Sequence, residues 1–168
     1  MSPSSSNNAI PISGVVPKGE WRGEAIDRVV LDYDGRHRRR IVLAGESGQA
    51  YLLDLPQALH LRDGDGLRIA GRGVVAVVAQ AEPLLEVRAA SAEALIRLAW
   101  HIGNRHLAAA IQRDRILIRR DRVIAHMLEH QGATVREVEA PFDPEGGAYQ
   151  DHVHDPGDQG HGEHDHGH

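Results

Sequence analysis

The last 18 residues of the chain, DHVHDPGDQGHGEHDHGH, hold six of its twelve histidines. Imidazole is the commonest metal ligand, and intervening glycines would let several rings reach one ion. The segment has one sizeable apolar residue, Val153, so it cannot pack a core and is expected to be flexible. A tail that served only solubility would have no need of imidazole. We therefore predict metal binding by the tail histidines, which are His152, His154, His161, His164, His166 and His168.

A second candidate is the stretch WHIGNRH, Trp100–His106. Gly103 is expected to end a helix there, with His101 in the last turn and His106 just beyond it. A five-residue spacing across a helix end does not define a chelate. These histidines could be metal ligands, or helix-end residues favoured by the helix dipole.

The chain has no cysteine, which excludes disulfides, thiolate metal sites and cysteine nucleophiles. The remaining ligand types favour borderline ions such as nickel, zinc, copper or cobalt. Catalytic motifs find little support. The only lysine, Lys18, forms no phosphate-binding loop, GESG (45–48) is one residue short of a nucleophile elbow, and there is no H-E-x-x-H. We expect no enzyme.

The formal net charge is −5, and the tail carries five acids and no lysine or arginine, which leaves the rest of the chain neutral. The basic run RHRRR (36–40) has no interleaved aromatic residues for base stacking, so a solvated or partner-binding face is favoured over nucleic acid. The N-terminus resembles no signal peptide, and no aliphatic run is long enough to span a membrane. We expect a cytoplasmic protein.

Short strands and turns dominate the first half of the body. Strand patterns run over 25–32, 38–43, 50–55 and 67–70, with Asp34-Gly35 as a hairpin turn and DGDG (63–66) as another turn. Gly71 and Gly73 mark the end of this part, and residues 74–78 form a connecting strand.

The second half alternates strands and helices. A strand over 84–89 precedes a helix that Ser91 caps, whose apolar face is Leu95, Leu98, Ala99 and Ile102. Strands over 108–111 and 116–118, a second helix capped by Asp121, and a strand over 134–140 follow. The order strand–helix–strand–strand–helix–strand predicts a ferredoxin-like fold. The expected class is α+β, divided into a disordered segment 1–19, a β-rich protein-interaction domain 20–78, a ferredoxin-like metal-binding domain 79–149 that ends in a linker (141–149), and the His-rich tail 150–168.

Three stretches together carry a family resemblance. HIGNRH, then DRVIAHMLEHQGATVREVEAPFDPEGGAY, then the His-rich end resemble UreE, the urease accessory protein that acts as a nickel chaperone. The resemblance covers roughly residues 15–168, including the division into a β-rich and a ferredoxin-like part.

The resemblance implies a homodimer joined through the C-terminal domains, with His106 meeting its symmetry mate and holding nickel(II) between the chains. His152 and His154 would complete the coordination, and the distal four histidines would add capacity. The chaperone would pass nickel to the urease apoprotein with the accessory GTPase UreG as partner. Zinc(II) and copper(II) are further ions that such a site could take in vitro.

The chain departs from the family at one place. Some members carry extra histidines before the second helix, where this chain has Arg119, Arg120 and Arg122, which cannot ligate a metal. His126 and His130, at positions i and i+4, could chelate a surface ion, although exposed helix residues are the favoured interpretation. His37 and His60 are isolated and need no role.

Two other functions remain open. A metalloenzyme using His101 and His106 would need a third rigid ligand, which the sequence does not supply near the motif. A His-rich storage or detoxification protein would bind metal through the tail without needing a dimer site.

Overall fold

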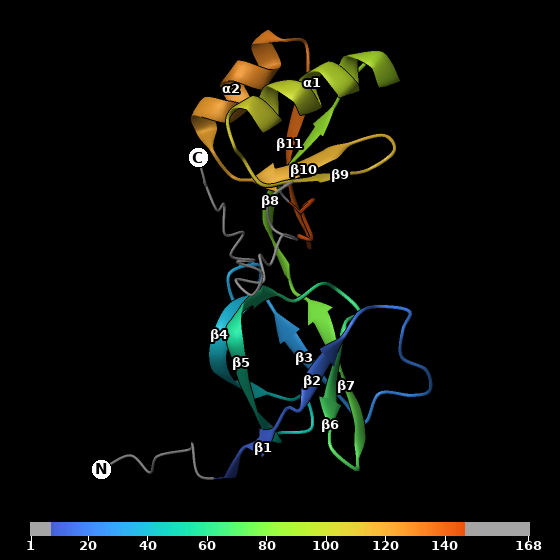
Figure 1. The fold of residues 1–168 in the computed structure, drawn as a ribbon. Coiled ribbons are helices and arrows are strands. Elements are labelled where there is room, and N and C mark those ends of the chain that lie inside the picture. The colour runs from blue at the N-terminus through green and yellow to red at the C-terminus, as the bar shows by residue number, and fades with distance from the viewer. Residues whose placement is uncertain (1–7, 147–168) are drawn as a thin grey trace, which may run out of the picture.

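The computed structural model describes residues 8–146, and these form two units joined end to end (Figure 1). The first unit contains seven strands: β1 (Ile10–Pro11), β2 (Gly14–Val16), β3 (Asp27–Leu31), β4 (His37–Ala44), β5 (Ala50–His60), β6 (Gly66–Ile69) and β7 (Gly73–Ala79). The second contains β8 (Ala81–Arg88), α1 (Ala92–Asn104), β9 (Ala109–Ile111), β10 (Ile116–Arg119), α2 (Arg122–His130) and β11 (Thr134–Pro141).

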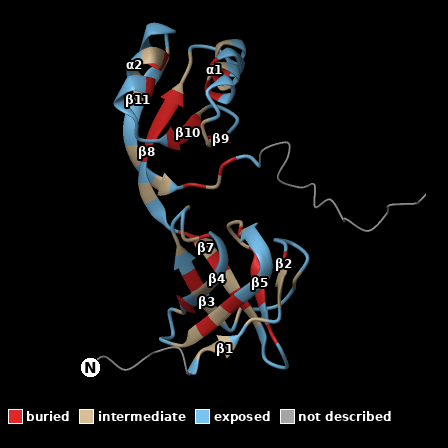
Figure 2. Cartoon of the chain, turned by 60° about the vertical axis from the view of Figure 1, so that its left-hand side comes forward, coloured by how far each residue is buried: buried red, intermediate tan, exposed pale blue. Residues whose placement is uncertain are grey.

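The first unit consists of two sheets, ordered β1-β5-β4 and β2-β6-β7-β3. Alternate residues of β7 are buried, and Val75 and Val77 meet Leu43 and Leu53 of the other sheet in one core. Figure 2 marks the buried residues on the strands of this unit in red. The aliphatic composition suits such a core, because β-branched and leucine side chains fill the space between two sheets.

Two expectations for this unit are wrong. The segment 1–19 is not disordered over residues 10–16, because β1 pairs with β5 and β2 pairs with β6, which buries Val16. Asp34-Gly35 forms a turn, but not a hairpin. β3 pairs in parallel with β7, whereas β4 pairs with β5, so this turn carries the chain from one sheet to the other.

The second unit is an antiparallel sheet, ordered β11-β8-β10-β9, with both helices on one face (Figure 1). Leu85 and Val87 of β8 point toward the helices and pack with Leu98 and Leu128. The elements follow the predicted order. Ser91 and Asp121 cap the two helices as expected, each accepting hydrogen bonds from backbone amides of the first turn.

The other face of this sheet is partly covered by the chain that follows β11. Phe142 is fully buried against Leu84, Ala110 and Leu117. A linker was expected over 141–149, but its first half is packed structure, because Phe142, the one phenylalanine of the chain, fills the helix-free face. No helix among residues 8–146 is long and apolar enough to cross a membrane.

Candidate metal site

The candidate site begins at the C-terminal end of α1. Helix α1 continues through Gly103, which was expected to end it, and stops at Asn104. The left-handed residue of the turn is His106, with φ of 56°, and it is the one non-glycine residue with positive φ among residues 8–146. The amide of His106 donates to the carbonyl of Gly103 (2.9 Å) and that of Leu107 to Ile102 (3.5 Å). This is a Schellman cap with histidine where glycine is usual.

The left-handed backbone conformation of His106 is unfavourable for the stability of the turn. The left-handed region costs an L-residue with a Cβ roughly 1–2 kcal/mol. Gly103, three residues earlier, could adopt it without that cost, but its φ is not positive. The packing of Leu107 against the core that contains Ile102 holds the turn in place. Backbone strain of this kind collects at functional positions, so we infer that the imidazole of His106 has a role.

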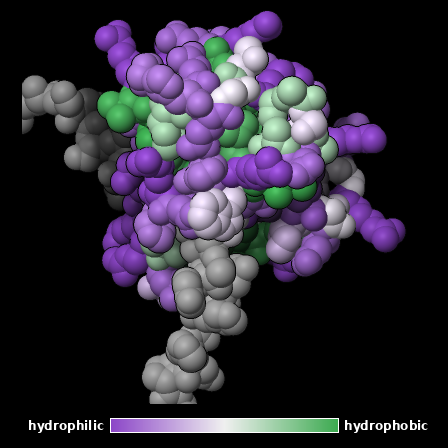
Figure 3. Space-filling view, turned by 90° about the horizontal axis from the view of Figure 1, so that it is seen from above, coloured by the Kyte–Doolittle hydropathy of each residue, from purple (hydrophilic) through white to green (hydrophobic). Residues whose placement is uncertain are grey.

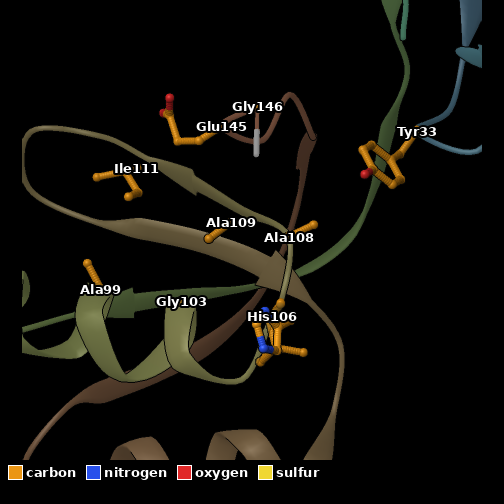
Figure 4. Close-up of a pocket in the computed structure, with 10 residues that line it drawn as sticks. Tyr33, Ala99, Gly103, His106, Ala108, Ala109, Ile111, Glu145 and Gly146 are labelled. Atoms are coloured by element: carbon orange, nitrogen blue, oxygen red, sulfur yellow. The ribbon is translucent and has the colours of Figure 1, made fainter. Parts of the chain in front are cut away.

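His106 is exposed and lines a hollow of about 440 Å³ beside the edge strand β9. Figure 4 shows His106 at the end of α1, with Tyr33 reaching toward the hollow from the first unit. Glu145 and Gly146, the last described residues, lie in the same wall. The remaining lining residues are small or apolar: Ala99, Gly103, Leu107, Ala108, Ala109 and Ile111.

The position of Glu145 and Gly146 depends on an anchor in the first unit. The Arg36 side chain is fully buried, and its guanidinium donates to the carbonyls of Leu61 (3.2 Å) and Phe142 and to the Asp143 carboxylate (3.0 Å). Buried arginine is rare unless it is paired, and here its partners come from both units. We name residues 142–146 the tail root.

Two further bonds extend the anchoring of the tail root. Arg62 donates to the carbonyl of Pro144 at 2.8 Å, and the amide of Glu145 donates to the carbonyl of Ala109 at 2.9 Å. The second bond pairs the tail root with β9, which is the edge of the sheet. The chain is thereby led from the junction of the units to the hollow beside His106.

His60 lies at the same junction. Its ring centroid is 5.0 Å from that of Tyr33 and 5.8 Å from that of His37, and its Nε2 is 3.9 Å from Asp143 Oδ1. Burial, together with the nearby Arg36 and Arg62, lowers the pKa of His60, so the neutral ring is favoured. Neither His60 nor His37 is isolated, although the sequence suggested that they were.

The predicted ligands are distributed unevenly. His106 lies at the hollow, whereas His101 is half-buried beside Trp100, with ring centroids 5.2 Å apart, and does not line it. His152, His154, His161, His164, His166 and His168 lie outside the described residues. Within residues 8–146, no three histidine, aspartate or glutamate side chains are grouped so that they could hold a metal ion.

Sequence reasoning missed Arg36 and Asp143. Arg36 stands in the basic run RHRRR, for which a solvated or partner-binding face was expected. It is buried, whereas Arg38–Arg40 of the same run are exposed. Its neighbour Asp34 also joins the units, through an ion pair with Arg119 at 2.9 Å. The available signal is the Phe of PFDPEGGAY, because a large apolar side chain is unusual in a solvated linker.

An exposed apolar surface lies close to the hollow. Ile96 and Trp100, one turn apart on α1, are 69% and 65% exposed, and Ile111 of β9 is 50% exposed. In the view onto the helices in Figure 3, hydrophobic groups come to the surface between hydrophilic ones. Ala99, Gly103 and Ile111 of the same elements line the hollow, so the apolar surface and the His106 site are adjoining.

Comparisons with known proteins agree on one family. The model of the UreE urease accessory protein N-terminal domain matches residues 11–80, and that of the C-terminal domain matches residues 82–168. A urease accessory protein UreE of Bradyrhizobium sp. (strain BTAi1) is 52% identical over 151 residues, covering 90% of this chain and 72% of the relative. The UreE of Chelativorans sp. (strain BNC1) is 53% identical over 144 residues, which cover 86% of this chain and 90% of the relative.

A third relative, the UreE of Ruegeria sp. (strain TM1040), is 56% identical over 124 residues, which cover 73% of this chain and 68% of the relative. The resemblance seen in the sequence is thereby confirmed. The family is named as an accessory to urease and not as an enzyme, and its role is in urease maturation. This chain belongs to the UreE family of urease accessory proteins.

Proposed function

We propose that the protein is a nickel(II) metallochaperone that delivers the ion for assembly of the urease active site. The observation that carries the proposal is the shared hollow: exposed His106 and the end of the tail root lie in one wall. A strained histidine is thus placed where the histidine-bearing tail begins. Imidazole ligands suit nickel, and zinc(II) and copper(II) are competing ions of the same class.

In this proposal the ion is held between two chains. One exposed imidazole cannot hold a metal ion well, but a two-fold axis beside His106 brings in a second. The apolar surface of Ile96, Trp100 and Ile111 adjoins the hollow and would be covered by a second copy of the chain. We therefore assign the dimer contact to the C-terminal unit, around the end of α1.

The tail supplies the remaining ligands. His152 and His154 stand six and eight residues after Gly146, so their backbone can reach at most about 22 and 29 Å from it. Tethering gives these rings an effective concentration on the order of millimolar at the hollow. His161, His164, His166 and His168 would collect ions from solution. Ligands on a tether can leave one at a time, which suits transfer to another protein.

The domain assignment follows the same proposal. The C-terminal unit is assigned to the ferredoxin-like class, supported by its strand order β11-β8-β10-β9 with two helices on one face. The β-rich unit, over 20–78 with β1 and β2 added, would bind partners in the cytoplasm, among them UreG and the urease apoprotein. The exposed Arg38–Arg40 are candidates for that contact.

A His-rich storage or detoxification protein is the second candidate, favoured by the six histidines of the tail. Such a protein has no use for a strained histidine at a dimer axis. The two functions therefore differ in what they require of His106.

Urease activation at limiting nickel tests the proposal. His106→Gly and His106→Asn both remove the imidazole and tolerate the left-handed turn. Each is expected to lower activation strongly, while His37→Gln, an exposed histidine of the first unit, should leave it intact. Full activation by both His106 variants would overturn the proposal, and metal content unchanged by them would favour storage.

A further inference from the structure

A second histidine cluster lies on α2, apart from the proposed nickel site. His126 and His130 are one turn apart and exposed, and their ring centroids are 4.4 Å apart at an interplanar angle of 84°. Together with Glu129 they line a shallow hollow of about 230 Å³. This hollow shares no lining residue with the one at His106.

We propose that His126 and His130 form a separate binding site for a borderline divalent cation, with Glu129 holding a metal-bound water. Positions i and i+4 of a helix present two imidazoles on one face, so one nitrogen of each can reach the same ion. Nickel, zinc and copper are the ions that imidazole ligands suit. Water completes the coordination of this open site.

The position on the helix also favours a cation. His130 is the last residue of α2, where unpaired carbonyls make the local potential negative, and His126 stands one turn before it. Glu129 adds a carboxylate in the same hollow. Arg122 stands one turn before His126 and cannot ligate a metal, so it adds no further ligand on that side of the pair.

The sequence H-M-L-E-H has the spacing of the H-x-x-E-H motif of one class of zinc hydrolases. Such enzymes need a further protein ligand and an enclosed substrate cleft. Residues 8–146 supply no third ligand to this pair, and both imidazoles face solvent. The site therefore binds an ion without catalysing hydrolysis, and it does not depend on the proposed nickel function.

The test is a zinc(II) titration of the full-length protein, followed by NMR of the histidine ring nitrogens. Zinc is diamagnetic, so each ring reports its own binding. In the wild type, the His126 and His130 signals should shift together with one midpoint. In His130→Gln, the midpoint for His126 should rise at least about tenfold, because the chelate is lost. The matched control, His37→Gln, should not change it.

Backbone amide spectra check that α2 is intact in each variant, which exposed substitutions should leave unchanged. The proposal is overturned if the His126 and His130 rings stay unshifted after the other histidines have responded. It is also overturned if His126 responds equally in the wild type and in His130→Gln. The His106 signal is read in the same spectra, so failure of that site would be seen separately.

Discussion

Arg36 and Asp143, which are 107 positions apart, form an ion pair with a nitrogen–oxygen distance of 3.0 Å at the junction of the two units. The guanidinium is fully buried, and the same group binds the backbone of Phe142. The β-rich unit therefore holds residues 142–146, the tail root, from which the His-rich sequence continues. A role for this unit in positioning the tail follows, beyond any contact with partner proteins.

Replacement of Arg36 should release the tail root. Arg36→Met leaves the carbonyls of Leu61 and Phe142 without their donor, which is expected to cost about 1–3 kcal/mol in the free energy of unfolding. Urea denaturation measures the loss, and hydrogen exchange should show faster exchange of the Glu145 amide. Arg39→Met, an exposed residue of the same run, is the control. Equal protection of Glu145 in both variants would contradict the anchoring role.

His106 should limit the stability of its own turn. Glycine adopts the left-handed conformation without a Cβ clash, so His106→Gly is expected to be more stable than His106→Ala by about 1 kcal/mol. Thermal unfolding of the two variants without metal measures this difference. If the alanine variant is as stable as the glycine variant, the turn carries no strain, and the argument for a functional histidine is weakened.

Much of the fold could be predicted from local patterns. The alternation of Val75 and Val77 and the helical spacing of Leu95, Leu98 and Ile102 reflect faces that each element must bury. The caps Ser91 and Asp121 act within one turn, so sequence alone reveals them.

What could not be predicted depends on distant partners. Gly103 is a residue type that commonly ends a helix. The left-handed residue of the Schellman cap is nevertheless His106, three residues later, where Leu107 can pack into the core. Arg36 is buried only because Leu61, Phe142 and Asp143 meet it in space. The importance of His106 was taken from the family resemblance, and its backbone conformation now gives an independent physical reason.

A charge cluster on the helix-free face of the C-terminal sheet should make stability depend on acid pH. Arg88 and Arg115 donate to the buried Glu86 at 2.8 and 2.7 Å, and these bonds lower its pKa to about 2. The ionised form is favoured in the folded state, so its contribution is present above the ordinary value of 4.5 and is lost as pH falls from there toward 2.

Glu86→Gln is expected to cost on the order of 1–3 kcal/mol at pH 7, because two charge-assisted bonds are weakened. The difference between the variant and the wild type should shrink as pH falls below about 4.5. Chemical denaturation at a series of pH values measures both effects. A difference that stays constant down to pH 2 would refute the assigned pKa shift.

His60 should make the junction sensitive to milder acid. Burial, Arg36 and Arg62 lower the pKa of His60 in the folded chain. Below the ordinary value of 6.5, the unfolded chain therefore binds a proton at His60 that the folded chain does not yet bind. Stability should therefore fall as pH drops below about 6.5. His60→Gln is expected to remove part of that slope, whereas His126→Gln, which replaces an exposed histidine of the second unit, serves as a control. Parallel pH profiles for wild type and His60→Gln would contradict this account.

The central claim is a nickel site built from His106 of two chains and completed by the tail. Calorimetric nickel titration of the intact protein, of a version ending at Gln150 and of His106→Gly tests it most directly. The account predicts that the truncated protein still binds one nickel per two chains, more weakly than the intact protein because His152 and His154 are missing, and that His106→Gly loses this site. If truncation abolishes all nickel binding while His106→Gly changes nothing, the tail alone is the site, and the proposed mechanism of delivery is wrong.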